Sequence, residues 1–181
     1  MSDEASHNND SPPNARLQAK LASFQSSWVF DRSLSIEMLS SLTQEELLWT
    51  PGKKLGSFWK QFRHMGRVQE NYLAAIDTRK VDFSTDGASF GGRSITHPEA
   101  TADLDKQALL DYLQDVDLRL TKRLAAGPLP ETIDWFGEPV GLAEHLFRLS
   151  SHETLHHGQW IVYCQILGRP FPKSWSIWGL H

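Results

Sequence analysis

The sequence predicts an all-α protein, a four-helix bundle with a long crossover between its second and third helices. Three observations favour this fold. Apolar residues recur every three or four positions in four long segments, as they do in amphipathic helices. Strand-like alternation of apolar and polar residues does not form a series along the chain. The segment between the second and third helices, residues 78–100, is polar and contains three glycines.

Residues 1–13 read MSDEASHNNDSPP, and we expect a disordered tail there. This run lacks the basic start and the apolar stretch of a secretory signal. Residues 14–181 then form a single domain, because domains commonly contain about 100–200 residues. Hydrophobic residues make up 40% of the chain, which is enough for a sizeable core.

The first helix is predicted over residues 14–39. Its apolar residues follow helical spacing: Leu17, Leu21, Phe24 and Trp28. Thr43 followed by Glu46 has the form of a capping box, so a short helical turn is expected from Gln44.

The second long helix is predicted from about Ser57, a suitable N-cap, to Asp77. Its apolar residues share one face: Phe58, Phe62, Met65, Tyr72, Leu73 and Ile76. Residues 78–100 show no sustained period. A loop of this length is either functional or a crossover between the two halves of a bundle.

The third helix is predicted over residues 103–126, and Gly127-Pro128 provides a strong stop. Residues 132–136 are expected to form a short extended piece, followed by the fourth helix over residues 140–167. The C-terminal segment is too short for another long helix, and its apolar residues are expected to pack onto the bundle: Trp175, Ile177 and Trp178.

Charge and composition exclude several classes of partner. The formal net charge is −4, without the basic stripe that nucleic-acid binding requires. Apolar windows are shorter than the roughly 20 residues of a membrane span. Cys164 is the single cysteine, so an intramolecular disulfide is impossible and a cytoplasmic location fits best. A small core hydrophobe is a more common role for such a cysteine than a nucleophile.

Histidines interrupt the apolar face of the fourth helix. His152 and His156 are four residues apart, so their side chains lie one above the other on that face. Buried imidazoles need partners. One metal ion would satisfy both rings, and backbone carbonyls, waters or a carboxylate would do so equally. His145 lies two turns earlier, about 10 Å along the axis, which is too far to share an ion.

The segment HETLH at residues 152–156 matches the H-E-x-x-H pattern of zinc metalloproteases, in which the glutamate is the general base. Gln159 and Val162 depart from the extended form of that pattern, and no acidic residue follows Glu153 to act as a downstream ligand. A protease is therefore the least favoured reading. Glu153 remains a weak catalytic candidate, and its other roles are to orient a ligand or to pair with an arginine such as Arg148.

A third ligand is available upstream. His64 lies at the shoulder of the apolar face of the second helix, from which it can turn towards a neighbouring helix. Bundle cores build metal sites from facing helices in this way. The alternative is a half-exposed histidine bonded to solvent. Gln159 either forms a hydrogen bond near the site or packs structurally.

These residues resemble the DinB-like superfamily of bacterial metal-binding four-helix bundles, from about residue 25 to residue 178. The resemblance is carried by LTQEELLWTPG, by SFWKQFRHMGRVQENYLAAI and by HETLHHGQWIVYCQILGRPFPKSW. The three histidines and the Gly158-Gln159 step are its most specific parts. His157 stands where many members have arginine, which puts any contact of that arginine with substrate or partner in doubt.

The resemblance implies one divalent metal ion held by His64, His152 and His156, with water or substrate at the remaining positions, and a homodimer. Three histidines suit zinc, nickel, iron, cobalt or manganese. Some DinB-like members use the ion to activate a low-molecular-weight thiol. The first hypothesis is therefore a metal-dependent thiol transferase or related hydrolase acting on a small molecule. The second is a non-enzymatic stress protein that binds metal or a small ligand, because fold does not decide function.

Overall fold

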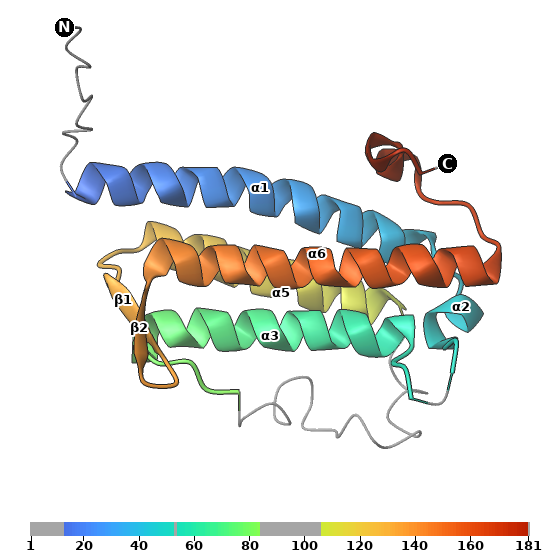
Figure 1. The fold of residues 1–181 in the computed structure, drawn as a ribbon, viewed down its shortest axis with the longest axis horizontal. Coiled ribbons are helices and arrows are strands. Elements are labelled where there is room, and N and C mark those ends of the chain that lie inside the picture. The colour runs from blue at the N-terminus through green and yellow to red at the C-terminus, as the bar shows by residue number, and fades with distance from the viewer. Residues whose placement is uncertain (1–12, 53, 84–105, 181) are drawn as a thin grey trace, which may run out of the picture.

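The computed structural model describes residues 13–52, 54–83 and 106–180. Within them the chain is mostly helical, as predicted. Figure 1 shows the long helices of this described part lying side by side: α1 (Pro13–Ser41), α3 (Phe58–Thr78), α5 (Lys106–Ala125) and α6 (Leu142–Leu167). Most of the predicted tail and of the predicted crossover falls on residues 1–12 and 84–105, outside the described residues, and Pro13 already belongs to α1.

Each long helix contacts two others. α1 packs on α5 and α6, and α3 packs on the same two helices. The start of α5 lies at the end of α1, where Lys106 Nζ donates hydrogen bonds of 3.0 Å to the carbonyl oxygens of Ser40 and Leu42. At the opposite end, the Val81 amide donates to the Asp134 carbonyl. α3 and α5 therefore run in the same direction (Figure 1).

Local chemistry fixes the helix ends within a few residues of the predicted positions. The predicted capping box begins α2 (Gln44–Leu48): the Thr43 amide donates to Glu46 Oε2 at 2.8 Å, and the Glu46 amide donates to Thr43 Oγ1 at 3.2 Å. Ser57 caps α3 as predicted, since its hydroxyl accepts from the Lys60 amide. No helix of the described part is long and apolar enough to cross a membrane.

A β-hairpin precedes α6 and corrects two predictions. β1 (Thr132–Trp135) pairs with β2 (Glu138–Gly141) in antiparallel register. The extended piece therefore has a partner strand, and α6 begins at Leu142 rather than at residue 140. Phe136 and Gly137 form the turn with φ values of 54° and 99°, the left-handed conformation that two-residue hairpin turns require. With one glycine in its turn and strands of four residues, the hairpin leaves only a weak sequence pattern.

The buried hydrophobic side chains lie where the helices pack on one another. At one of these interfaces, a glycine sets how closely two helices approach. A Cβ atom at Gly66 of α3 would lie 2.3 Å from Cε1 of Tyr112 in α5. At the C-terminal end, the 3₁₀ helix η1 (Lys173–Trp178) buries Trp175, whose indole donates to the Leu34 carbonyl at 3.2 Å.

The prediction that all three apolar residues of the C-terminal segment pack onto the bundle is only partly right. Trp175 is fully buried, whereas Ile177 and Trp178 remain 63% and 56% exposed. Trp178 lies edge-on to Phe30 of α1 at the molecular surface, with ring centroids 6.2 Å apart. Of the three residues, only Trp175 is buried against both α1 and α6: its indole bonds the Leu34 carbonyl, and its ring lies beside Trp160.

Candidate metal centre

Three histidine side chains from two helices converge between α3 and α6. His64 comes from α3, and His152 and His156 come from successive turns of α6. The Nε2 atoms of His64 and His152 lie 3.1 Å apart, and those of His152 and His156 lie 3.3 Å apart. One nitrogen atom of each ring falls within 4.8 Å of the other two. The structure therefore brings together the three residues predicted as ligands.

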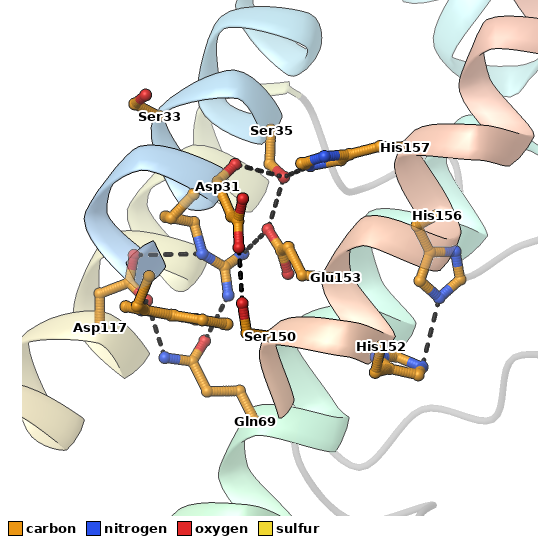
Figure 2. A network of polar contacts seen from close by, with 12 residues as sticks. Asp31, Ser33, Ser35, Gln69, Asp117, Ser150, His152, Glu153, His156 and His157 are labelled. Carbon is orange, nitrogen blue, oxygen red and sulfur yellow. Dashed lines mark hydrogen bonds and ion pairs between the residues drawn. The ribbon is translucent and has the colours of Figure 1, made fainter. Parts of the chain in front are cut away.

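Helix geometry and packing place these rings. His152 and His156 lie one turn apart on the same side of α6, as Figure 2 shows. α3 packs along this side of α6, where Phe62 stacks on Trp160 with ring centroids 4.3 Å apart. Two residues beyond Phe62, His64 turns from the shoulder of the apolar face towards α6.

Hydrogen bonds among the rings cannot satisfy all three nitrogen atoms. A neutral imidazole nitrogen carries either one proton or one lone pair. The Nε2 atom of His152 faces both neighbouring rings, so one good hydrogen bond leaves the other contact unmatched. An ion that accepts a lone pair from each ring would satisfy the three nitrogen atoms together.

The environment keeps the two α6 histidines uncharged. Burial lowers the pKa of His152 to about 4, with smaller contributions from His64 and Arg32. Burial also lowers the pKa of His156 to about 3, assisted by the neighbouring His152 and His64. Both rings are therefore neutral near pH 7, which is the form that binds metal ions.

An open pocket of about 480 Å³ reaches the histidines from outside, with His64 and His156 in its wall. Acidic side chains are absent from this wall within the described part of the chain. Two amines, two apolar side chains and two polar groups contribute to the wall: Lys54, Lys60, Leu55, Val162, Gln159 and Tyr163. A small molecule in this pocket would lie beside His64 and His156.

Comparison with known families supports the resemblance seen in the sequence. Residues 27–160 match the family model of the DinB superfamily. The chain belongs to the DinB superfamily. A crystal structure of a DinB-like protein from Bacillus cereus ATCC 10987 superimposes with a TM-score of 0.63 at 20% sequence identity, over 82% of this chain and 93% of that chain. At this identity the likeness shows the fold alone. A comparison with curated proteins finds no match.

In this DinB superfamily member, Glu153 points away from the histidine cluster. Figure 2 shows its carboxylate on the α1 side of α6. Its Oε1 accepts a hydrogen bond of 2.5 Å from the Ser35 hydroxyl and lies 3.4 Å from Nη1 of Arg32. The side chain is buried, and burial raises its pKa. Arg148, the partner considered from the sequence, instead pairs with Glu144.

His157 also lies on the α1 side of α6. Its Nε2 lies 2.8 Å from the Ser35 hydroxyl. Because Ser35 has one proton and donates it to Glu153, the imidazole is the donor in this contact. Burial, with a contribution from Arg32, lowers the pKa of His157 to about 4. The residue that departs from the superfamily pattern is thus part of the buried interior, next to Trp160 and Trp175.

Arg32 is the centre of a buried polar network that joins all the long helices described. Its partners Gln69, Asp117 and Glu153 are labelled in Figure 2. Its Nη2 donates to Gln69 Oε1 at 2.6 Å, its Nε lies 3.3 Å from Asp117 Oδ2, and its guanidinium stacks over Trp28. Nearby, Ser150 donates to Asp31, whose pKa burial raises. This network was not predicted. The available signal was a charged residue one turn after a core tryptophan.

The remaining candidates have structural surroundings. His145 is fully buried, accepts from the Trp135 indole and faces the Tyr72 carbonyl. The Cys164 thiol is buried beside Met38, as expected for a core residue. Gln159 lines the pocket, and its hydrogen bond with His156 opposes the lowering of the His156 pKa. Gln61, which sequence reasoning overlooked, is a further hydrogen-bond partner of His156.

Proposed function

We propose that this protein binds one divalent metal ion through His64, His152 and His156 and uses it as an enzyme acting on a small molecule in the adjoining pocket. The reaction we favour is transfer of a low-molecular-weight thiol to an electrophile, or a related hydrolysis. The observation that supports the proposal is that the side chains of His64, His152 and His156 converge beside an open pocket.

The spacing of the ring nitrogens suits a first-row divalent ion. Two ligand atoms about 2.0–2.1 Å from a tetrahedral zinc ion lie roughly 3.3–3.4 Å from each other. Two of the three Nε2–Nε2 separations, 3.1 and 3.3 Å, are close to this value, and the remaining pair of ring nitrogens, from His64 and His156, lies within 4.8 Å. Three histidines also suit nickel, iron, cobalt and manganese, so the ion stays open to measurement.

The site offers three imidazole side chains as ligands. Among the described residues, no other histidine, cysteine or carboxylate joins the group. Such an ion would act as a Lewis acid and lower the pKa of a thiol or water that reaches it. Lys54 and Lys60 add positive charge to the pocket wall, which favours a deprotonated thiol there.

The geometry disfavours a zinc protease. That mechanism needs the glutamate of the H-E-x-x-H motif beside the ion as general base. Glu153 instead lies on the opposite side of α6, bonded to Ser35 and close to Arg32. We therefore give Glu153 a structural role. The homodimer, the cytoplasmic location and the small-molecule substrate remain predictions.

Thiol consumption by the metal-loaded protein tests the proposal. Protein purified without an affinity tag is loaded in turn with zinc, nickel, cobalt, manganese or iron(II) and supplied with a panel of low-molecular-weight thiols and a generic electrophile. We expect turnover with at least one ion, falling to the metal-free rate in His64→Ala and in His156→Ala.

His157→Gln is the matched control. His157 is next to the proposed ligand His156 in the sequence, but its side chain contacts Ser35 of α1 and not the histidine cluster. Metal content and turnover should therefore persist in this variant. One bound ion per chain without turnover across the panel would favour the alternative, a non-enzymatic metal-binding stress protein. No bound ion in the wild-type protein would refute the metal site itself.

A further inference from the structure

Gln61 connects His156 to the backbone that precedes α3. Its side chain is buried, and its Oε1 lies 3.3 Å from Nδ1 of His156. Its Nε2 donates a hydrogen bond of 3.2 Å to the Gly56 carbonyl oxygen. The Tyr163 hydroxyl donates to the same carbonyl at 2.9 Å and also hydrogen-bonds Gln61.

These contacts determine which way the Gln61 amide faces. A backbone carbonyl oxygen can only accept hydrogen bonds, so the amide NH₂ must face Gly56. Tyr163 uses its proton on the same carbonyl, so its oxygen can accept the second amide proton. The reverse orientation would place the Gln61 oxygen against the Gly56 oxygen. The amide oxygen therefore faces His156.

The orientation of the amide determines the tautomer of the imidazole. An amide oxygen beside Nδ1 requires a proton on Nδ1, which leaves the lone pair of the neutral ring on Nε2. Nε2 is the atom that faces His152 in the histidine cluster. We propose that Gln61, held by the Gly56 carbonyl and the Tyr163 hydroxyl, is a positioning residue that fixes the Nδ1–H tautomer of His156 and so directs its Nε2 lone pair into the metal site.

The positioning role of Gln61 rests on the proposed function, because it assumes a metal ion at the histidines. The tautomer of His156 can be measured without metal. Hydrogen bonds to the outer nitrogen of a metal-binding histidine set ring orientation and ligand basicity. Gln61 lies one turn before His64 on α3, so the same helix turn provides one ligand and orients another. Gln61 also lines the pocket, but in this role it acts through His156 and is not itself a ligand of the ion.

The tautomer is tested by ¹⁵N NMR of the histidine side chains in metal-free, full-length protein, at a pH above about 7.5 where free imidazole is neutral. We expect His156 to carry its proton on Nδ1 in the wild type. In Gln61→Met, which has no amide oxygen to accept the Nδ1 proton, the ring should change to the Nε2–H form. An Nε2–H ring in the wild type, or an unchanged ring in Gln61→Met, overturns the proposal.

Two glutamines of α6 serve as comparisons for Gln61 of α3. Gln159 hydrogen-bonds His156 from the same helix, and Gln165 is exposed on that helix. Gln159→Met and Gln165→Met should both preserve the Nδ1–H form. Loss of that form in Gln159→Met together with its retention in Gln61→Met would assign the role to Gln159 and refute ours.

Metal affinity gives the second measurement. Gln61→Met should weaken zinc binding by about 10–100-fold in a chelator competition, because removal of such outer partners typically has effects of this size. The melting temperature of metal-free Gln61→Met should stay near that of the metal-free wild type. Equal zinc affinity in Gln61→Met and the wild type contradicts the positioning role. If the wild type binds no zinc or other ion, the proposed function fails while the NMR result still decides the tautomer.

Discussion

Neighbouring residues of the HETLHH segment serve two different environments. His152 and His156 form one pair at a spacing of four, and Glu153 and His157 form a second pair one position later. One residue corresponds to about 100° around a helix, so the two pairs face different sides of α6. The first pair lies beside His64, with His156 also lining the pocket, and the second pair contacts Ser35 of α1. The segment therefore carries both a candidate metal site and part of a buried network.

Arg32 should be essential for stability, because it is the cation of that network. Its side chain lies 3.4 Å from Glu153 and 3.3 Å from Asp117, and Glu153 is only 1% exposed. Removing one partner of a buried ion pair leaves an uncompensated charge and typically costs about 3–5 kcal/mol. We expect Arg32→Met to lower the free energy of unfolding by this amount in urea titrations.

Arg148→Met is the control for loss of an arginine. Arg148 pairs with Glu144 at the surface, where such helix pairs contribute about 0.3–0.5 kcal/mol. If Arg32→Met lowers the free energy of unfolding as little as Arg148→Met does, the buried network around Arg32 does not stabilise the packing of the helices.

At the scale of elements, His145 attaches the hairpin to two helices. It lies on α6, accepts a hydrogen bond of 3.0 Å from the Trp135 indole of β1, and stacks on Tyr72 of α3 with ring centroids 4.6 Å apart. Its Nε2 lies 3.0 Å from the Tyr72 carbonyl oxygen. Because Trp135 donates to Nδ1, the Nε2 atom must carry the proton. Both ring nitrogens are thus satisfied only in the neutral form.

This arrangement predicts a loss of stability in acid. Burial lowers the pKa of His145 below 6.5, Arg148 adds to the effect, and the hydrogen bond to Tyr72 opposes it. The unfolded chain then takes up a proton that the folded protein resists. The contribution of His145 to stability is therefore complete above the unfolded pKa and is lost as pH falls towards the folded pKa.

Urea titrations of metal-free protein between about pH 7 and pH 5 measure this effect. The free energy of unfolding should fall more steeply with decreasing pH in the wild type than in His145→Gln, by up to about 1.4 kcal/mol per pH unit. Parallel pH profiles for the two proteins would show that His145 does not titrate differently on folding.

For the whole molecule, the proposed ion links binding to stability. An ion that binds only the folded protein adds about 2.7 kcal/mol when its concentration is 100 times its dissociation constant. For a chain of this size, 1 kcal/mol shifts the melting temperature by about 2–4 °C. A chelator should therefore lower the melting temperature of the metal-loaded protein by about 5–11 °C.

The chelator should have little effect on His152→Ala, which lacks a proposed ligand, and its full effect on His157→Gln, which faces Ser35. The same shift in His152→Ala as in the wild type would show that the chelator acts at another place. We expect the metal-free protein to stay folded, because its core contains many fully buried side chains, among them Trp59, Trp160 and Trp175.

The sequence by itself determined the helices, their caps and the facing of the α6 histidines. The apolar period of α3, the capping box of Thr43 and Glu46, and the spacing of His152 and His156 are local properties, set by interactions within a few residues. The hairpin was only half predicted, because its second strand depends on pairing with the first. The helical period placed His156 on the apolar face of α6, and its side chain is buried in the structure.

Tertiary structure decided what those buried polar residues contact. His64 had two readings from the sequence, and the packing of α3 on α6 directs it to His152. Glu153 had several readings, and its partners Ser35 and Arg32 lie on α1, far away in the chain. Periodicity tells whether a side chain faces inwards. Which distant side chain it meets depends on how the helices pack, and a one-dimensional pattern holds no record of that geometry.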